Sequence, residues 1–288
     1  MRYLAALAVL LLSGCSALGL EELDTGELTG AALRMIGGAD ARDSEEEIAI
    51  GRTAGAQLVG TYGLVDEPAL QAYVNRVGLW LAMHTEREDL DWHFAVLDDD
   101  GVNAWAAPGG YVFITRGMLA LLENEAELAG VLGHEIAHVV RRHHLEAVRS
   151  RAGLDTVLQL GRAVYSARAG EEAVLDQDTL ERLEGAVGDL YEQGLSREDE
   201  FEADRLAMVI AARGGYDPFA YPAVLQRMQG LQREGTALTA LTRTHPDTGD
   251  RLEALAPALD APELAASEGA LLRERFLAHA APALGDGE

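Results

Sequence analysis

The sequence has no lysine, a single cysteine and no long apolar segment. All 23 basic residues are arginines, and 48 acidic residues bring the formal net charge to −25. A chain this negative repels polyanions, so we expect no nucleic acid partner. One cysteine excludes an internal disulfide framework. No apolar run approaches the roughly 18 residues of a membrane-spanning helix.

The remaining composition is that of a folded protein. The 288 residues are 48% hydrophobic and 25% charged, which is typical of globular chains and excludes wholesale disorder. The length suits one large domain or two small ones.

The N-terminus has the pattern of a secretion signal. Arg2 precedes the short apolar core over residues 4–12, and Leu12-Ser13-Gly14-Cys15 resembles a lipoprotein box. In such signals the cysteine is lipidated, so we expect residues 1–14 to be removed and lipid on Cys15 to tie the chain to a membrane. The alternative is a free, buried cysteine in an ordinary signal. Ser16, in place of aspartate, favours by resemblance the periplasmic face of the outer membrane of a Gram-negative cell.

The rest of the chain divides by composition into three segments. We expect an acidic, glycine-containing tether over residues 15–43, a main domain over residues 44–258, and an alanine-rich helix or tail over residues 259–288.

Capping and hydrophobic patterns predict a mostly helical domain with a small β-sheet. Alternation and turns indicate three short strands, and caps or apolar periodicity indicate helices. The strands are expected over residues 92–97, 102–106 and 111–115. The main helices are expected over residues 44–58, 196–212 and 218–230. Further helices are expected from Pro68, from Asn124 to about Arg151 and from Arg251 to about Ala281.

The sharpest motif is His134-Glu135-Ile136-Ala137-His138. Residues four apart share one face of a helix, so both imidazoles can reach one Zn²⁺. Glu135 lies beside them and is suited to take a proton from a metal-bound water. The alternative is a surface helix with two solvated histidines.

A catalytic zinc site needs a third protein ligand, and the capped segment 196–204 offers acids for it. Glu200 and Asp204 again lie four residues apart, so Glu200 can bind the metal while Asp204 orients a ligand imidazole. Spacing alone leaves Glu198 and Glu202 open. A helix N-terminus also favours acids through its dipole, without any metal.

Together these motifs resemble the HtpX and CAAX-prenyl-protease family of gluzincin zinc metallopeptidases. The resemblance covers about residues 44–258 and includes the segments 47–52, 103–111, 115–119, 127–129 and 244–246, with Arg251 after the last of them. It implies an α+β fold, namely a mostly helical zincin-type domain with a small β-sheet over the active-site helix.

The resemblance also implies roles for individual residues. Glu200 becomes the third ligand of one Zn²⁺ per chain and Asp204 its supporting acid. His245 becomes either a catalytic residue or a fourth, inhibitory ligand, and the alternative is a loop histidine stacked on Pro246. Arg251 becomes a stabiliser of the site, although a plain surface arginine is the alternative. The strand beginning at Tyr111 resembles the family's substrate-binding edge strand, whose contacts are expected from Asn103, Gly109, Gly110 and Tyr111.

The chain departs from the membrane-embedded branches of the family. It resembles small, soluble, lipid-anchored bacterial members of the LoiP kind, and we expect it to lack the tetratricopeptide domain of BepA-like members. The predicted function is a zinc endopeptidase that degrades unfolded or misassembled envelope proteins, with Glu135 as general base. One alternative is a latent zinc-binding, chaperone-like factor closed by His245, and another is a structural lipoprotein with an accidental motif.

Overall fold

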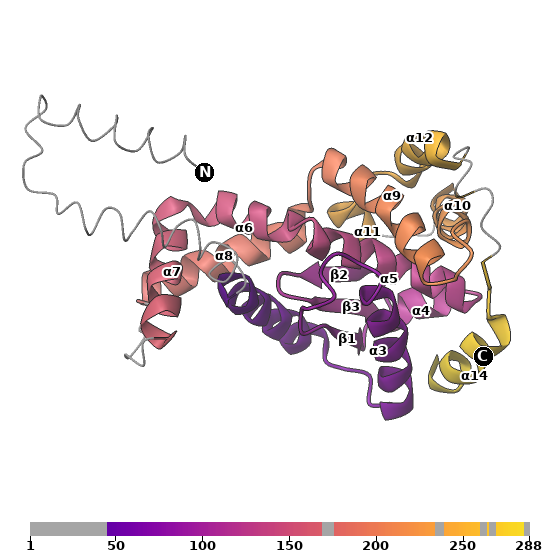
Figure 1. Ribbon diagram of the computed structural model, residues 1–288, viewed down its shortest axis with the longest axis horizontal. Coiled ribbons are helices and arrows are strands. Elements are labelled where there is room, and N and C mark those ends of the chain that lie inside the picture. Colours follow the sequence, from indigo (N-terminus) through magenta and orange to yellow (C-terminus); the bar gives the residue numbers. More distant parts are fainter. Residues whose placement is uncertain (1–44, 169–175, 234–238, 260–263, 265–268, 285–288) are drawn as a thin grey trace, which may run out of the picture. The chain divides into compact units, whose positions relative to one another are not determined.

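The computed structural model describes residues 45–168, 176–233, 239–259, 264 and 269–284 (Figure 1). All the described residues belong to one unit of the chain, residues 45–288. The predicted signal, Cys15 and the tether lie outside the described residues. Helix 45–62 comes first, followed by α3 (Pro68–Ala82), β1 (His93–Leu97), β2 (Ala104–Ala107), β3 (Tyr111–Thr115), α4 (Arg116–Leu121), α5 (Glu125–Val140), α6 (His143–Ala152), α7 (Leu154–Arg168), α8 (Gln177–Gln193), α9 (Arg197–Arg213), α10 (Ala220–Arg233), α11 (Thr239–Thr244), α12 (Thr248–Leu259) and α14 (Arg273–Leu284).

The three strands form one sheet in the order β1-β3-β2. The β1 strand pairs parallel with β3, and β2 pairs antiparallel with it, so Tyr111 lies opposite both His93 and Ala107. The predicted strands are confirmed to within two residues at each end. The expectation that the Tyr111 strand is the edge strand is wrong, because both of its sides are occupied by neighbouring strands. Among the described strands, β2 forms the edge of the sheet on the side of β3 that faces away from β1.

Both faces of the sheet are covered, which explains why its strands are mostly apolar, apart from the exposed His93 at the start of β1. Val112 and Ile114 of β3 face the main core, which also contains the apolar residues of α3, α5 and α9. Phe113, which lies between them in sequence, points to the opposite face and packs with Trp105 of β2 and Leu58 of helix 45–62. The β2 strand and α5 are in contact. The predicted fold, a mostly helical zincin-type domain with a small sheet over the active-site helix, is confirmed.

Helix 45–62 is fixed against the turn between β2 and β3. A side chain at Gly51 would place its Cβ 1.8 Å from the carbonyl oxygen of Pro108, so only glycine permits this approach. Four residues earlier, the buried carboxylate of Glu47 accepts hydrogen bonds from both terminal nitrogens of Arg87 and from the backbone N–H of Gly109. These contacts hold the turn in place.

The predicted long helix from Asn124 to Arg151 is broken in two. The α5 helix ends at Val140, and Arg142 adopts a left-handed conformation with φ of 61° before α6 begins at His143. Such a conformation is uncommon for a residue other than glycine. The sequence Arg141-Arg142-His143-His144 contains no glycine or proline to mark the break.

The predicted helix from Arg251 to Ala281 is also divided. The α12 helix ends at Leu259, and α14 begins at Arg273. Phe276 and Ala280 of α14 are buried in the main core, so α14 packs on the domain. In the part of the chain that the structure describes, no helix is long and apolar enough to cross a membrane.

We predict that Phe276 anchors α14. Phe276→Ala is expected to lower the free energy of unfolding by about 3–5 kcal/mol, because it removes a buried aromatic ring and leaves a cavity. The matched control is Leu277→Ala, since Leu277 is 41% exposed and its loss should cost about 1 kcal/mol or less. Urea denaturation measures both, and equal losses for the two variants would contradict this assignment.

Candidate zinc site

The first two candidate ligands lie on α5, whose start is fixed as the sequence predicts. The Asn124 side chain accepts a hydrogen bond from the backbone N–H of Glu127, and the Glu127 carboxylate accepts one from the N–H of Glu123. Further along this helix, His134 and His138 are 3% and 1% exposed, and their Nε2 atoms lie 3.1 Å apart. The helix thus aims both imidazoles at one point.

The α9 helix packs closely on α5 and brings Glu200 to the two histidines. A Cβ at Gly133, next to His134, would lie 3.2 Å from the backbone oxygen of Ala207 on α9, so glycine permits the close approach. The Oε2 atom of Glu200 is 3.6 Å from His134 Nε2, and Oε1 is 3.5 Å from His138 Nε2.

The structure also distinguishes Glu200 from Glu198 and Glu202, the other two acids whose spacing allowed them to be the third ligand. Ser196 caps α9 through the backbone N–H of Asp199, as predicted. Glu198 is exposed to solvent. Glu202 forms an ion pair with Arg141, so Glu200 is the acid of this turn that meets both imidazoles.

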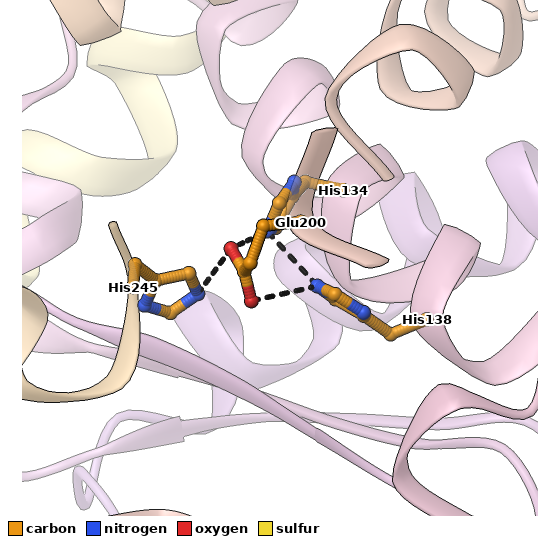
Figure 2. Close-up of side chains that lie close together, drawn as sticks. All are labelled: His134, His138, Glu200 and His245. Carbon is orange, nitrogen blue, oxygen red and sulfur yellow. Dashed lines mark hydrogen bonds and ion pairs between the residues drawn. The ribbon is translucent and has the colours of Figure 1, made fainter. Parts of the chain in front are cut away.

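His245 completes a cluster of four possible ligands (Figure 2). Its Nε2 atom is 3.8 Å from Glu200 Oε2 and 4.0 Å from Glu135 Oε1. Ligand atoms of His134, His138, Glu200 and His245 all lie within 4.8 Å of one another. Burial lowers the pKa of His245 to about 4 despite the opposing charge of Glu200, so its imidazole is neutral at pH 7 and suited to bind a metal.

The chemistry of these residues fits Zn²⁺. Both carboxylate oxygens of Glu200 are buried without a hydrogen-bond partner, which is costly for an acid unless a cation lies beside it. Burial opposes protonation of His134, yet its contacts with Asp204 and Glu200 raise its pKa to about 9. The carboxylates thus favour positive charge here, and histidine nitrogen with carboxylate oxygen is a typical zinc donor set.

A second layer of contacts orients His134. The Asp204 carboxylate lies 2.9 Å from His134 Nδ1 and accepts hydrogen bonds from Arg251 and from the hydroxyl of Tyr221. Burial would raise the pKa of Asp204, but the neighbouring Arg251 and His134 outweigh it and hold that pKa below its usual range. Arg251 is 2% exposed, so the alternative of a plain surface arginine is wrong.

His138 is oriented by a different group. The Nδ1 atom of His143 lies 3.0 Å from His138 Nδ1, and the Nε2 atom of His143 is 3.6 Å from both Asp199 and Glu202. The left-handed Arg142 makes this contact possible, since it turns the chain so that His143 lies against α5. The sequence gives no local signal for this arrangement, nor for the role of Tyr221.

Glu135 lies on α5 between the two histidine ligands and is 2% exposed. Burial, reinforced by Glu200 and opposed by His134, raises its pKa to about 7. A carboxylate with a pKa near neutral is suited to take up and release a proton at physiological pH. Its assignment as the general base stays a prediction.

The predicted substrate-binding residues are not all placed as expected. Gly109 and Gly110 have positive φ angles of 79° and 99° and form the turn before β3, and Tyr111 stacks on His93. Asn103 lies at the start of β2, where its side-chain oxygen accepts a hydrogen bond from the N–H of Ala104.

The side of β2 that faces away from β3 has no neighbouring strand among the described residues. Ala106 pairs with Val112 across β3, and its carbonyl oxygen accepts a hydrogen bond from the hydroxyl of Tyr191 on α8. Beside it, a hollow of about 290 Å³ is lined by Asn103, Trp105, Tyr191 and Thr244. The α8 helix thus occupies part of the strand edge next to the cluster.

The fold and the cluster together define the class of the protein: a zincin-type metallopeptidase domain of the gluzincin kind, with two histidines on α5 and a glutamate on α9. The family model of peptidase family M48 matches residues 68–258, about two thirds of the chain. The chain therefore belongs to peptidase family M48, which includes the group it was expected to resemble.

Curated relatives agree with this assignment. The chain is 31% identical over 215 residues to the beta-barrel assembly-enhancing protease of Escherichia coli, which covers 72% of this chain and 42% of that protein. It is 29% identical over 236 residues to the protein of that name from Yersinia pestis, and 31% identical over 172 residues to the mitochondrial metalloendopeptidase OMA1 of Arabidopsis thaliana. The Yersinia match covers 80% of this chain and 45% of that protein. The Arabidopsis match covers 59% of this chain and 32% of that protein. The chain thus spans less than half the length of these three relatives.

We predict that Asp204 sets the zinc affinity through His134. Asp204→Asn is expected to weaken zinc binding by about 10–100-fold, because it removes the charge that orients and polarises the imidazole. Competition with a chromogenic chelator measures the affinity. The matched control is Glu198→Gln, an exposed position on the same helix, which should bind zinc as the wild type does. Unchanged affinity in a folded Asp204→Asn protein would refute this role.

Proposed function

We propose that the chain is a zinc-dependent endopeptidase. The observation that carries this proposal is the buried carboxylate of Glu200, which lies between His134 and His138 without a hydrogen-bond partner among the described residues and with Glu135 nearby. Membership of peptidase family M48 and the relatives named as metalloendopeptidases support it. His134, His138 and Glu200 would hold one Zn²⁺ per chain.

The proposed mechanism follows from the positions of the side chains. Bound zinc supplies a Lewis acid that polarises the scissile carbonyl and makes water more acidic. Glu135 takes a proton from the attacking water as its oxygen bonds to the carbonyl carbon. Glu135 then returns the proton to the nitrogen as the carbon–nitrogen bond breaks. Asp204 and Arg251 hold His134 in place throughout.

We further propose that the substrate is an extended, unfolded segment that adds to the free side of β2. Strand addition uses backbone hydrogen bonds and therefore accepts many sequences, which suits a protease that removes misfolded proteins. The Tyr191 hydroxyl must leave the Ala106 carbonyl oxygen before a substrate backbone can bind there.

The proposed setting is the cell envelope of a Gram-negative bacterium, with unfolded or misassembled envelope proteins as substrates. The lipoprotein-like sequence ending in Cys15 supports a lipid anchor, for which we propose the periplasmic face of the outer membrane. The Escherichia coli and Yersinia pestis relatives, named as beta-barrel assembly-enhancing proteases, are consistent with this setting.

Cleavage of unfolded β-casein tests the activity. The wild-type chain with zinc is expected to cleave casein, and Glu135→Gln to be slower by about 10²–10⁴-fold, because the general base is lost. Glu198→Gln is the control and should retain the wild-type rate. Equal cleavage by wild type and Glu135→Gln would show that Glu135 is not the base.

His245 favours a second candidate function, a latent zinc-binding factor with little turnover. Four protein ligands around zinc leave no position for water, as in structural sites, and His245 lies within reach of the other three. The same contact would make the peptidase self-inhibited at rest.

His245→Ala distinguishes these possibilities. We expect this variant to cleave casein at least several-fold faster than the wild type, because loss of the fourth ligand admits water. A slower rate would instead assign His245 a direct part in the reaction. If neither protein cleaves casein while both bind zinc, the latent binding factor is the better description.

A further inference from the structure

A second hollow lies away from the zinc cluster, beside the first turn of α5. Its volume is about 480 Å³, and it is lined by residues of α3, the turn after α9, and α14. This size falls within the range of about 300–1,000 Å³ typical of ligand sites. Glu125 lines it and His134 does not. They are nine positions apart on α5, which is about 13.5 Å along the helix axis.

The walls of this hollow are aromatic and held in place. The ring of Tyr73 stacks on His279 with centroids 4.5 Å apart. Trp80 is 46% exposed, and its indole N–H donates a 2.8 Å hydrogen bond to the carbonyl oxygen of Gly214. A rigid, half-exposed tryptophan offers an apolar face with little loss of freedom on binding.

The floor of the hollow is Glu125, whose negative charge is balanced by Arg275. Glu125 is fully buried, accepts hydrogen bonds from the hydroxyls of Tyr73 and Tyr216, and pairs with Arg275 on α14. Burial opposes ionisation, but these partners together hold the pKa of Glu125 below its usual value. The Glu125–Arg275 pair therefore adds no net charge to the hollow.

Arg76 remains as a cation without a counter-ion. It lies one helical turn before Trp80, is exposed, and makes no ion pair or hydrogen bond within the described part of the chain. Among the described residues lining the hollow, Glu125 is the sole acid. In a chain with a net charge of −25, a hollow with surplus positive charge and aromatic walls favours an anion that carries an apolar group.

From this combination we infer that the hollow binds the C-terminus of a polypeptide that ends in an apolar or aromatic residue. The terminal residue carries its carboxylate and its side chain on one Cα atom. Arg76 and Trp80, adjacent on one face of α3, match that spacing: the guanidinium pairs with the carboxylate and the indole packs on the side chain. An internal acidic side chain lacks the apolar group. The site lies outside the zinc cluster and goes beyond the proposed peptidase activity.

Calorimetry with two peptides tests this inference. The probes are N-acetylated peptides of four alanines and a final phenylalanine, one with a free carboxylate and one amidated. The protein is the full chain carrying Glu135→Gln, which keeps the probes intact and leaves the hollow unchanged. The free acid is expected to bind at least about tenfold more tightly than the amide, because the amide loses the charge-assisted pair.

Variants assign the binding to the hollow. Arg76→Gln should weaken binding of the acid about tenfold and leave the amide unchanged, and Trp80→Ala should weaken both. The matched control is Arg162→Gln, an exposed arginine on α7, which should bind both peptides as the parent does. Arg76 is exposed and has no ion-pair or hydrogen-bond partner among the described residues, so its replacement should preserve the fold, which circular dichroism checks.

Three results would overturn the inference: equal binding of acid and amide, unchanged binding in Arg76→Gln, or tighter binding of decanoate than of the peptide acid, which would assign the hollow to free amphiphiles. Casein cleavage, scored separately on the wild type, distinguishes failure of this site from failure of the proposed peptidase.

Discussion

The close packing of α5 on α9 is the constraint on which the rest of the site depends. It buries the Glu200 carboxylate, and the compensating groups among the described residues are imidazoles and the buried Arg251. Gly133 permits this approach, since a side chain there would crowd the backbone of α9. A buried acid held between two histidines is stable only with positive charge nearby. The packing of α5 on α9 therefore favours the binding of a metal ion at this position.

The contacts that orient His134 differ from those that orient His138. His134 is held by an acid and an arginine that lie on α9 and α12, and His138 by a histidine from α6. The first arrangement is charged and buried. The second is less charged, and its outer partners Asp199 and Glu202 are partly exposed. The two ligands are therefore tuned differently, although they occupy equivalent positions of one motif.

Local patterns in the sequence predicted the parts of the fold that local chemistry decides. The caps at Asn124 and Ser196, the three strands and the shared helix face of His134 and His138 all follow from residues close together in sequence. Distant contacts decide the rest. The helix breaks at Arg142 without a glycine or proline, because the contacts of His143 with α5 and α9 stabilise the turn. Strand order was also beyond local reasoning: the Tyr111 strand is central because β1 pairs on its far side.

The four residues of the cluster come from widely separated parts of the chain, with His134 near the middle and His245 more than a hundred positions later. Arg251, which holds Asp204 in place, comes later still. During synthesis on the ribosome, the residues of the candidate zinc site therefore come together only after Arg251 has been made. A chain that has not yet reached His245 and Arg251 has the helical motif but lacks the residues that complete the candidate zinc site.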